Sequence, residues 1–285
     1  MKHLLTIAVA VALFACGGAS GPRQLPPPPA GGPPTALQVD KPVYIPGEYI
    51  AWELSWKGIA GGKTRLMVGE PGTIDGRRAI IVRSETRSDG LLAMFRHVRD
   101  DLITTIDLDS SLPIESHGVF EFGKRGKQIK NTKVYATFNG DSYNIEYERK
   151  GVPRRSWTQN LPEGEVAYDT HSVLGALRAW EPEDGDRVYF YSLSGRRLYR
   201  VEVTASIRET LTIGLGTYPA RRFEGVGTRL ARNLATNAKR KPRHFSVWVS
   251  DDADRVPLLV RARTEFGDVQ VELVEYQGAA SVAKR

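Results

Sequence analysis

Apolar and polar residues alternate with a period of two along much of the chain. The alternation is clearest in residues 49–56, 199–208 and 269–273, where one face of an extended segment is apolar and the other is polar. This pattern is typical of strands that bury one face. Further, shorter candidates lie at residues 64–68, 79–83, 102–108, 114–122, 129–138, 143–147, 188–193, 223–228, 245–249 and 258–263. Pairs such as Asp-Gly and Ser-Gly separate them and favour tight antiparallel hairpins. We therefore predict an all-β fold, a large antiparallel meander forming a barrel or a strongly curved open sheet.

One segment departs from the alternation. Apolar residues recur at helical spacing over residues 173–180. Asp169 or Thr170 stands where an N-cap is expected, and Pro182 follows the last apolar position. These signals predict one short amphipathic helix, and a second helical turn is indicated at residues 91–95. The sequence shows no internal repeat of 20 to 50 residues, which disfavours a propeller or a solenoid.

The first residues indicate export. Lys2 precedes an apolar run at residues 4–14, and the small residue Ala15 precedes Cys16, the only cysteine of the chain. The run is too short to cross a bilayer as a helix. It resembles a bacterial lipoprotein signal, which implies that Cys16 becomes the lipidated first residue of the mature protein. The alternative is an ordinary signal peptide with an incidental cysteine.

The residues after Cys16 suggest where such an anchor would lie. Gly17 and Gly18 replace the aspartate that retains lipoproteins on the inner membrane of many Gram-negative bacteria. We therefore expect the outer membrane, with the periplasmic side favoured. The expected organisation is a signal peptide at 1–15, the lipidated Cys16 with a Pro/Gly-rich tether at 16–36, a single β domain at 37–277, and a flexible tail at 278–285.

Charge and cysteine content narrow the chemistry further. With Cys16 lipidated, no thiol remains for a disulfide, a thiolate nucleophile or a cysteine metal site. The formal net charge is +7, which in a cytosolic protein would suggest nucleic acid as a partner. Export replaces that option with anionic envelope polymers or lipid phosphates. The alternative is a basic, solvated surface without a specific partner.

Four motifs together carry a family resemblance. They are Pro46-Gly47-Glu48 before a strand, the glycine-rich turn at 58–62, the helix start Tyr168-Asp169-Thr170-His171-Ser172, and Trp248-Val249-Ser250-Asp251-Asp252 with the following Arg255-Val256-Pro257. Across residues 44–275 the chain resembles the domain of unknown function 3108 (DUF3108) family of exported bacterial proteins. The resemblance implies a β-rich envelope domain and supplies no activity, ligand or catalytic residue.

Two acidic motifs have structural interpretations. Asp251, Asp252 and Asp254 could coordinate Ca²⁺, but the glycine and the further ligands of a calcium loop are missing. We interpret them, together with Pro257, as a hairpin turn. Asp169, His171 and Ser172 include the residue types of a catalytic triad. Neighbours at a helix start cannot converge as nucleophile, base and orienter, so we interpret Asp169 and Ser172 as capping residues.

The sequence contains no recognisable enzyme or metal motif. There is no Gly-x-Ser-x-Gly elbow, His-Glu-x-x-His motif or Walker loop, and His97, His117, His171 and His244 lack ligand spacing. We therefore assign no catalytic residue, no metal site and no cofactor. An envelope carbohydrate hydrolase with two separated carboxylates stays open as an alternative, as does a structural partner of an envelope protein assembly.

The densest run of basic residues lies between positions 221 and 243, with Glu224 as its single acid. We predict an anion-binding surface for lipid headgroups or lipopolysaccharide phosphates, made by Arg221, Arg222, Arg229, Arg232, Lys239, Arg240, Lys241 and Arg243. The alternative is a solvated insertion between strands. The five tryptophans could also line a cavity for an apolar ligand, although core packing is the default explanation for them. The favoured function is a non-catalytic binding or scaffold domain for an apolar or anionic envelope component such as a lipid or glycolipid.

Overall fold

The computed structural model describes residues 32–124, 126–264 and 267–278. The strands are β1 (Thr35–Ala36), β2 (Tyr49–Trp56), β3 (Ile59–Val68), β4 (Gly72–Ile74), β5 (Arg77–Ser88), β6 (Arg96–Asp107), β7 (Pro113–Lys124), β8 (Lys130–Asn139), β9 (Ser142–Arg149), β10 (Val152–Asn160), β11 (Ala167–Asp169), β12 (Arg187–Ser194), β13 (Arg197–Ile213), β14 (Gly216–Arg229), β15 (Arg243–Ser250), β16 (Pro257–Thr264) and β17 (Gly267–Gln277). The helices are α2 (Gly90–Phe95) and α3 (Thr170–Ala179).

The strands form one continuous, mainly antiparallel sheet. Strands β12 to β17 pair in sequence order, β17 pairs with β2, and β2 leads through β3 and β5 to β10. Short strand β4 pairs with β5, and β1 and β11 each add a parallel pairing to β12. The fold class predicted from the sequence is confirmed as a strongly curved sheet, which over the described residues stays open instead of closing into a barrel.

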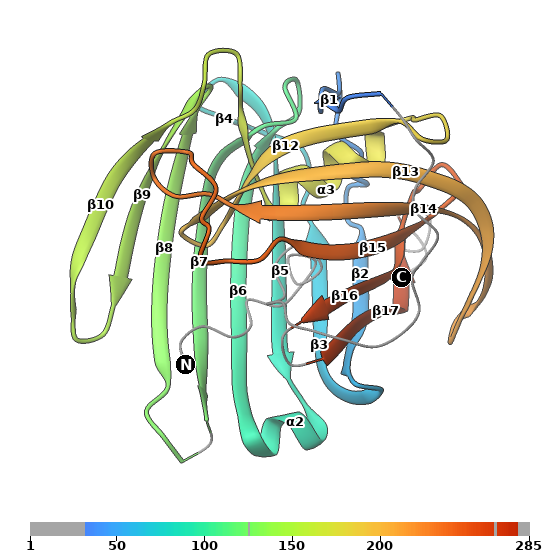
Figure 1. Cartoon of the computed structure of the whole chain (residues 1–285), viewed down its shortest axis with the longest axis horizontal. Coiled ribbons are helices and arrows are strands. Elements are labelled where there is room, and N and C mark those ends of the chain that lie inside the picture. The colour runs from blue at the N-terminus through green and yellow to red at the C-terminus, as the bar shows by residue number, and fades with distance from the viewer. Residues whose placement is uncertain (1–31, 125, 265–266, 279–285) are drawn as a thin grey trace.

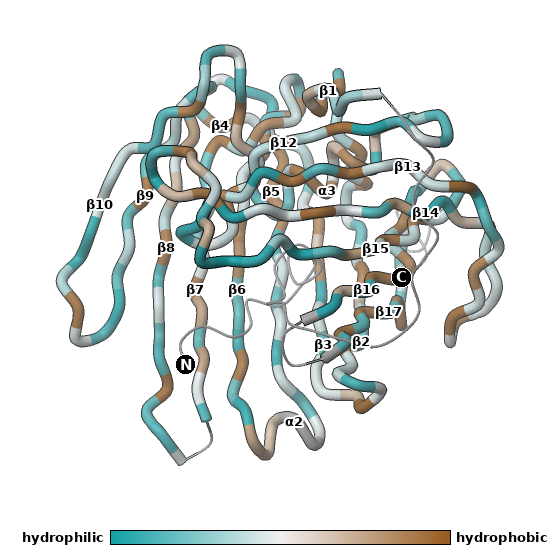
Figure 2. The backbone as a smooth tube through the Cα atoms, in the orientation of Figure 1, coloured by the Kyte–Doolittle hydropathy of each residue, from teal (hydrophilic) through white to brown (hydrophobic). Residues whose placement is uncertain are grey.

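The sheet curls so that its two halves face each other. Figure 1 shows β5–β10 running upright and β12–β16 running across them, with α3 between the two halves. Along β6 to β8 the hydropathy alternates from residue to residue (Figure 2), as expected for strands with one inward face. The largest hydrophobic cluster joins residues of β2, β3 and β5 to residues of α3 and β12–β17.

The structure differs from the sequence-based expectation at two elements. Strand β10 was not predicted, because Pro153 and a run of polar residues hide any alternation; the strand is exposed at most of its positions. Helix α3 was expected to be amphipathic, yet eight of its ten residues are buried, including polar His171 and Arg178. A helix enclosed between two faces of a sheet buries its polar side too, so those residues need partners inside the protein.

The buried tryptophans Trp52 and Trp248 belong to the hydrophobic core. Trp52 is 1% exposed and donates from Nε1 to the carbonyl oxygen of Pro257 at 2.7 Å. Trp248 is also buried and donates from Nε1 to Glu209 at 2.6 Å. A buried indole N–H needs an acceptor, and both find one in the fold. These two residues therefore pack as core side chains.

The expectations for the chain ends concern residues outside the described range. The signal at 1–15, Cys16 and most of the tether at 16–36 fall there, as do residues 279–285 of the tail. Thr35 and Ala36, assigned to the tether, form β1. Within the described residues, neither helix has the length and apolar character needed to cross a bilayer.

Candidate functional site

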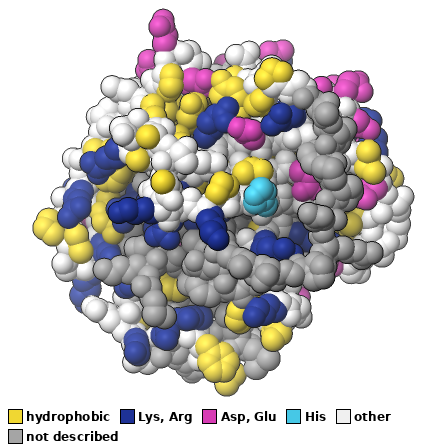
Figure 3. Space-filling view, in the orientation of Figure 1, with side chains coloured by type: hydrophobic (Ala, Val, Ile, Leu, Met, Phe, Trp, Pro, Cys, Tyr) yellow, Lys and Arg dark blue, Asp and Glu magenta, His cyan; other side chains and the backbone are white. Residues whose placement is uncertain are grey.

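Three basic segments, distant in sequence, meet at one opening of the curved sheet. We call this set the arginine mouth. Its members come from the β9–β10 hairpin, from the β12–β13 turn, and from the end of β14 with the loop that follows; they are Arg149, Arg155, Arg196, Arg197, Arg229, Arg232 and Arg240. Figure 3 shows basic side chains gathered on the left of the view, whereas the visible acidic side chains lie along the top and the right.

Strand alternation explains why arginines of the β9–β10 hairpin point into the mouth. Tyr143, Ile145 and Tyr147 on β9 are buried, so Arg149 continues their inward phase. Arg155 on β10 pairs in register with Tyr147. Because opposite residues of an antiparallel pair share a face, Arg155 lies on the same inward side.

Aromatic rings hold two of the guanidinium groups. The Cζ of Arg196 lies 4.7 Å from the ring centroid of Tyr147, and that of Arg232 lies 4.4 Å from the ring centroid of Trp157. Both rings belong to a second hydrophobic cluster, which packs β8–β10 against the β12–β13 hairpin and Leu230. Cation–π contacts of this kind favour the charged guanidinium and fix its position.

The mouth concentrates positive charge without local compensation. Over the described residues, no carboxylate lies within 4.0 Å of any of its seven arginines. Partial burial lowers the pKa of Arg196, and the nearby charges of Arg197, Arg155 and Arg149 lower it further, against an opposing effect of Tyr147. A site that disfavours its own cations in this way gains stability when an anion binds.

Arg229 shows the same effect most directly. Partial burial lowers its pKa, and the charges of Arg197, Arg240 and Arg243 add to the shift. Its buried Nε has no hydrogen-bond partner among the described residues. A buried donor of a cation normally finds an acceptor, so this nitrogen is a ready contact for an anionic ligand.

The structure divides the basic run predicted from the sequence. Arg229, Arg232 and Arg240 lie in the mouth, and Lys239 and Lys241 are exposed on the same loop. The other members are buried on strands β14 and β15: Arg221 donates to the carbonyl oxygen of Pro182 at 2.7 Å and pairs with Asp184 at 3.1 Å.

Arg222 and Arg243 are also held inside the fold. Arg222 lies 3.1 Å from Glu224, and Arg243 donates to the hydroxyl of Tyr199 at 3.0 Å. Sequence reasoning did not find Arg149, Arg155, Arg196 and Arg197. The phase of Arg149 with the buried side of β9 was the available signal for one of them.

A pocket of about 490 Å³ adjoins the mouth at the β9–β10 hairpin, lined by Asn131, Lys133, Glu148, Arg149, Lys150, Val152 and Arg154. Its acidic residue Glu148 lies 3.6 Å from Arg154. Glu146 also pairs with Arg154. Both acids therefore neutralise Arg154 on the outer face and leave Arg149 and Arg155 uncompensated.

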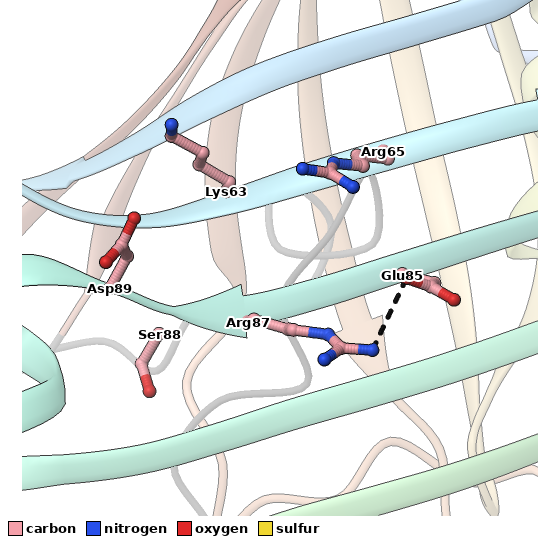
Figure 4. A pocket seen from close by; sticks show the side chains of 6 residues that line it. All are labelled: Lys63, Arg65, Glu85, Arg87, Ser88 and Asp89. Carbon is pink, nitrogen blue, oxygen red and sulfur yellow. Dashed lines mark ion pairs between the residues drawn. The ribbon is translucent and has the colours of Figure 1, made fainter.

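Another surface pocket, of about 390 Å³, lies on the outer face of β3 and β5 (Figure 4). Basic and acidic side chains alternate around it: Lys63, Arg65, Glu85, Arg87, Ser88 and Asp89. Glu85 pairs with Arg87 at 3.5 Å and with Arg83 at 2.6 Å. Because it mixes basic and acidic side chains on an exposed sheet face, this pocket resembles an ordinary solvated surface more than a ligand site.

The start of α3 is the centre of a buried polar network. Asp169 is the N-cap: its Oδ1 accepts from the backbone N–H of Ser172 at 2.8 Å, and the Ser172 hydroxyl accepts from the N–H of Asp169. The Thr104 hydroxyl donates to Oδ2 of Asp169. This reciprocal capping box fixes where the helix begins.

His171 links α3 to the sheet through both ring nitrogens. Nδ1 lies 2.9 Å from the Thr104 hydroxyl and Nε2 lies 2.8 Å from the Ser84 hydroxyl. Since Thr104 donates its proton to Asp169, Nδ1–H must donate to Thr104, and Nε2 accepts from Ser84. Burial lowers the pKa of His171 to about 4, with Asp169 opposing the shift, so the ring is neutral at pH 7.

The composition of this network resembles that of a hydrolase triad, but its geometry differs. Asp169 contacts Thr104 and does not orient the histidine directly. Ser84 and His171 are 5% and 1% exposed, so a substrate has no access to them. The network therefore holds α3 against β5 and β6 and offers no nucleophile.

A buried ion pair joins the other end of α3 to the N-terminal part of the sheet. Arg178 and Glu48 form a bidentate pair, with both N–O distances at 2.8 Å, and their side chains are 1% and 0% exposed. Nε of Arg178 also donates to the carbonyl oxygen of Asp254 at 3.2 Å. Sequence reasoning missed this pair, since its members lie 130 positions apart.

The aspartates at 251–254 sit in the turn between β15 and β16. Asp252 accepts from the Ser250 hydroxyl at 2.7 Å and from the backbone N–H of Arg255 at 3.0 Å. Asp251 pairs with Arg208 at 3.0 Å, and Asp254 accepts from the Tyr276 hydroxyl at 2.8 Å. Among the described residues, no group of three or more His, Cys, Asp or Glu side chains could hold a metal ion.

Comparison of the sequence with known protein families identifies one match. The sequence model described as "Protein of unknown function (DUF3108)" matches residues 51–274. The chain belongs to the DUF3108 family. This confirms the resemblance found in the sequence motifs. A comparison with curated proteins finds no match.

One solved structure with a TM-score above 0.5 supports the fold of this DUF3108 protein, and two others align with lower scores. A β-barrel-like protein of the DUF1849 domain of unknown function, from Brucella abortus, aligns with a TM-score of 0.53 and 10% identity, over 83% of this chain and 99% of that one. A protein from Bacteroides fragilis described as exported, with a YmcC-like fold, aligns with a TM-score of 0.37 and 7% identity, over 84% and 99%. A protein from Parabacteroides distasonis described as a lipoprotein gives 0.34 and 7%, over 85% and 100%.

Proposed function

We propose that this protein is a non-catalytic envelope protein that binds an anionic lipid or glycolipid through the arginine mouth. The observation that carries the proposal is the charge of that mouth. Seven arginines from three segments meet there, and none has a carboxylate within 4.0 Å among the described residues. Mutual repulsion of this kind destabilises the folded chain. Its presence therefore favours a role in binding anions.

The chemistry of the mouth suits a phosphate-bearing or carboxylate-bearing group. A guanidinium presents its donors in a planar fork that matches two oxygens of such a group. Tyr147 and Trp157 already hold two guanidiniums against their rings, so binding orders fewer side chains. The buried Nε of Arg229 gains the acceptor that it lacks.

A membrane anchor would bring the mouth close to such ligands. Part of this proposal is that Cys16 carries the lipid anchor and that the domain faces the periplasm from the outer membrane. The lipoprotein-like signal and the glycines after Cys16 support it. An envelope protein partner at the same surface is compatible with this placement.

Titration calorimetry with a soluble anionic lipid tests the ligand. The probe is dihexanoyl phosphatidylglycerol below its micelle concentration, and dihexanoyl phosphatidylcholine is the neutral comparison. Arg196→Gln/Arg197→Gln removes two mouth charges, each worth about 1 kcal/mol near an anionic group. We expect the dissociation constant to rise about 30-fold, and the wild-type affinity to fall with added salt.

A matched control removes the same charge elsewhere. Arg77→Gln/Arg78→Gln alters two exposed arginines at the start of β5, and the affinity should stay at the wild-type value. Equal losses of affinity in both double variants would show that net charge alone determines binding and would refute specific binding at the arginine mouth. So would wild-type binding that does not distinguish the anionic lipid from the neutral one.

A further inference from the structure

One end of the molecule carries an exposed apolar tip. It consists of the β2–β3 turn at residues 57–60, helix α2, and the described residues of the β7–β8 turn, 124 and 126–129. Figure 1 shows these segments at the lower end of the view, with β1 at the upper end. We call this set the lower tip.

Contacts between the segments make the lower tip one continuous surface. The N–H of Asp89, just before α2, donates to the carbonyl oxygen of Gly61 at 2.9 Å. After α2, Arg96 pairs in register with Lys124. Gly123 lies so close to Ile129 that an added Cβ would stand 3.1 Å from the Cα of Ile129. The order along the tip is therefore the β2–β3 turn, α2, and the β7–β8 turn.

Large hydrophobic side chains of the lower tip face solvent. Phe95 is 68% exposed and Met94 is 54% exposed, while Ile59 and Ile129 on the flanking turns are 50% and 44% exposed. Helix α2 has the sequence Gly-Leu-Leu-Ala-Met-Phe, without a charged residue. A hairpin connection normally uses Gly, Asn, Asp or Ser, so this composition marks a contact surface more than a turn.

Basic side chains surround the apolar ones. Lys57, Arg96, Lys124 and Lys127 lie on the same segments, and over the described residues none has a carboxylate within 4.0 Å. The nearest acids along the chain are already engaged. Asp89 accepts from the N–H of Gly90 at 2.7 Å, and Glu121 accepts from Asn131 and contacts His97.

We propose that the lower tip inserts into the headgroup layer of an anionic phospholipid bilayer. Phe95 and Met94 enter the boundary between headgroups and acyl chains, and the four cations pair with lipid phosphates around them. Apolar residues ringed by Lys and Arg are the composition that binds membrane interfaces. Figure 3 shows hydrophobic and basic side chains at the lower end, where no acidic side chain is visible. The lower tip shares no residue with the arginine mouth, although Thr132 on β8, three positions after Ile129, pairs in register with Arg149. Its proposed role goes beyond the proposed function.

A local probe on the full-length chain tests the insertion. Cys16→Ser removes the only native thiol, so a fluorophore sensitive to polarity can be attached through Met94→Cys alone. The control site is Ile207→Cys on β13, which is 51% exposed and similar in exposure to Met94. Vesicles contain phosphatidylcholine with or without phosphatidylglycerol. Because the readout is local, membrane binding through another segment does not change the signal at position 94.

On anionic vesicles we expect the emission at position 94 to shift to shorter wavelength and its quenching by iodide to fall several-fold. The probe at position 207 should not change. Lys124→Gln/Lys127→Gln should weaken the shift at 94, whereas Arg196→Gln/Arg197→Gln should leave it intact, which separates this result from the proposed function. No shift at 94, equal shifts at 94 and 207, or an equal shift on neutral vesicles would overturn the proposal.

Discussion

His171 makes the stability of the protein depend on pH in a defined window. Its pKa is about 4 in the folded chain and about 6.5 in an unfolded one. Between these values the unfolded chain binds a proton that the folded chain excludes, so stability falls as pH falls from about 6.5 towards 4. A pKa unit corresponds to about 1.4 kcal/mol, so the full loss is about 3 kcal/mol, of which about 2 kcal/mol is lost by pH 5.

The perturbation that isolates this effect is His171→Gln. Glutamine can keep one hydrogen bond to Ser84 or Thr104 but does not titrate, so the variant lacks the histidine contribution. Carboxylates titrate in both proteins and cancel in the difference. We expect the variant to be less stable at pH 7.5, and the gap in the free energy of unfolding to narrow by about 2 kcal/mol at pH 5.

Urea unfolding followed by tryptophan fluorescence measures both free energies. The five tryptophans lie across the domain, from β2 to β15, and report its global unfolding. If the two proteins keep the same stability difference from pH 7.5 to pH 5, His171 does not titrate as its burial requires, and the reasoning fails.

Two further substitutions test packing inside the fold. Arg178→Met should destabilise the protein by about 3–5 kcal/mol, because Glu48 is left buried and unpaired, and Glu48→Gln/Arg178→Met should recover most of the loss. The midpoints of urea unfolding, at unchanged slopes, measure both effects. A double variant no more stable than the single one would contradict the prediction. Gly225→Ala should cost about 1–3 kcal/mol, since its Cβ would stand 1.9 Å from the ring of buried Phe245. Phe245→Leu in the same chain should relieve part of that cost, and thermal melts showing no recovery would argue against a steric cause.

The sequence was informative where each strand buries one regular face. The alternation around Trp52 predicted β2, and similar patterns predicted the long strands β13 and β17. Strand β10 gave no such signal because Pro153 and polar neighbours face solvent along most of its length. Binary patterning predicts a strand only when burial imposes a period on it.

The site was less predictable than the sheet, because it depends on pairings between distant segments. Local charge density brought Arg229 to attention but gave equal weight to Arg221, which the fold buries beside Asp184. Arg196 joins the mouth only because the β12–β13 turn reaches Tyr147 on β9. Likewise, the polar residues of α3 find partners 67 to 130 positions away, a distance over which no sequence period operates.

The pairing of β17 with β2 has a consequence for how the protein is made. Strand β2 starts near residue 49, yet its second neighbour ends at Gln277. During synthesis, the N-terminal half must wait with one strand edge unprotected until almost the whole polypeptide has emerged. Such long-range pairing makes folding slow, and an open edge invites association with other chains. The newly made polypeptide is therefore a natural client for a holding chaperone until its last strand is available to pair.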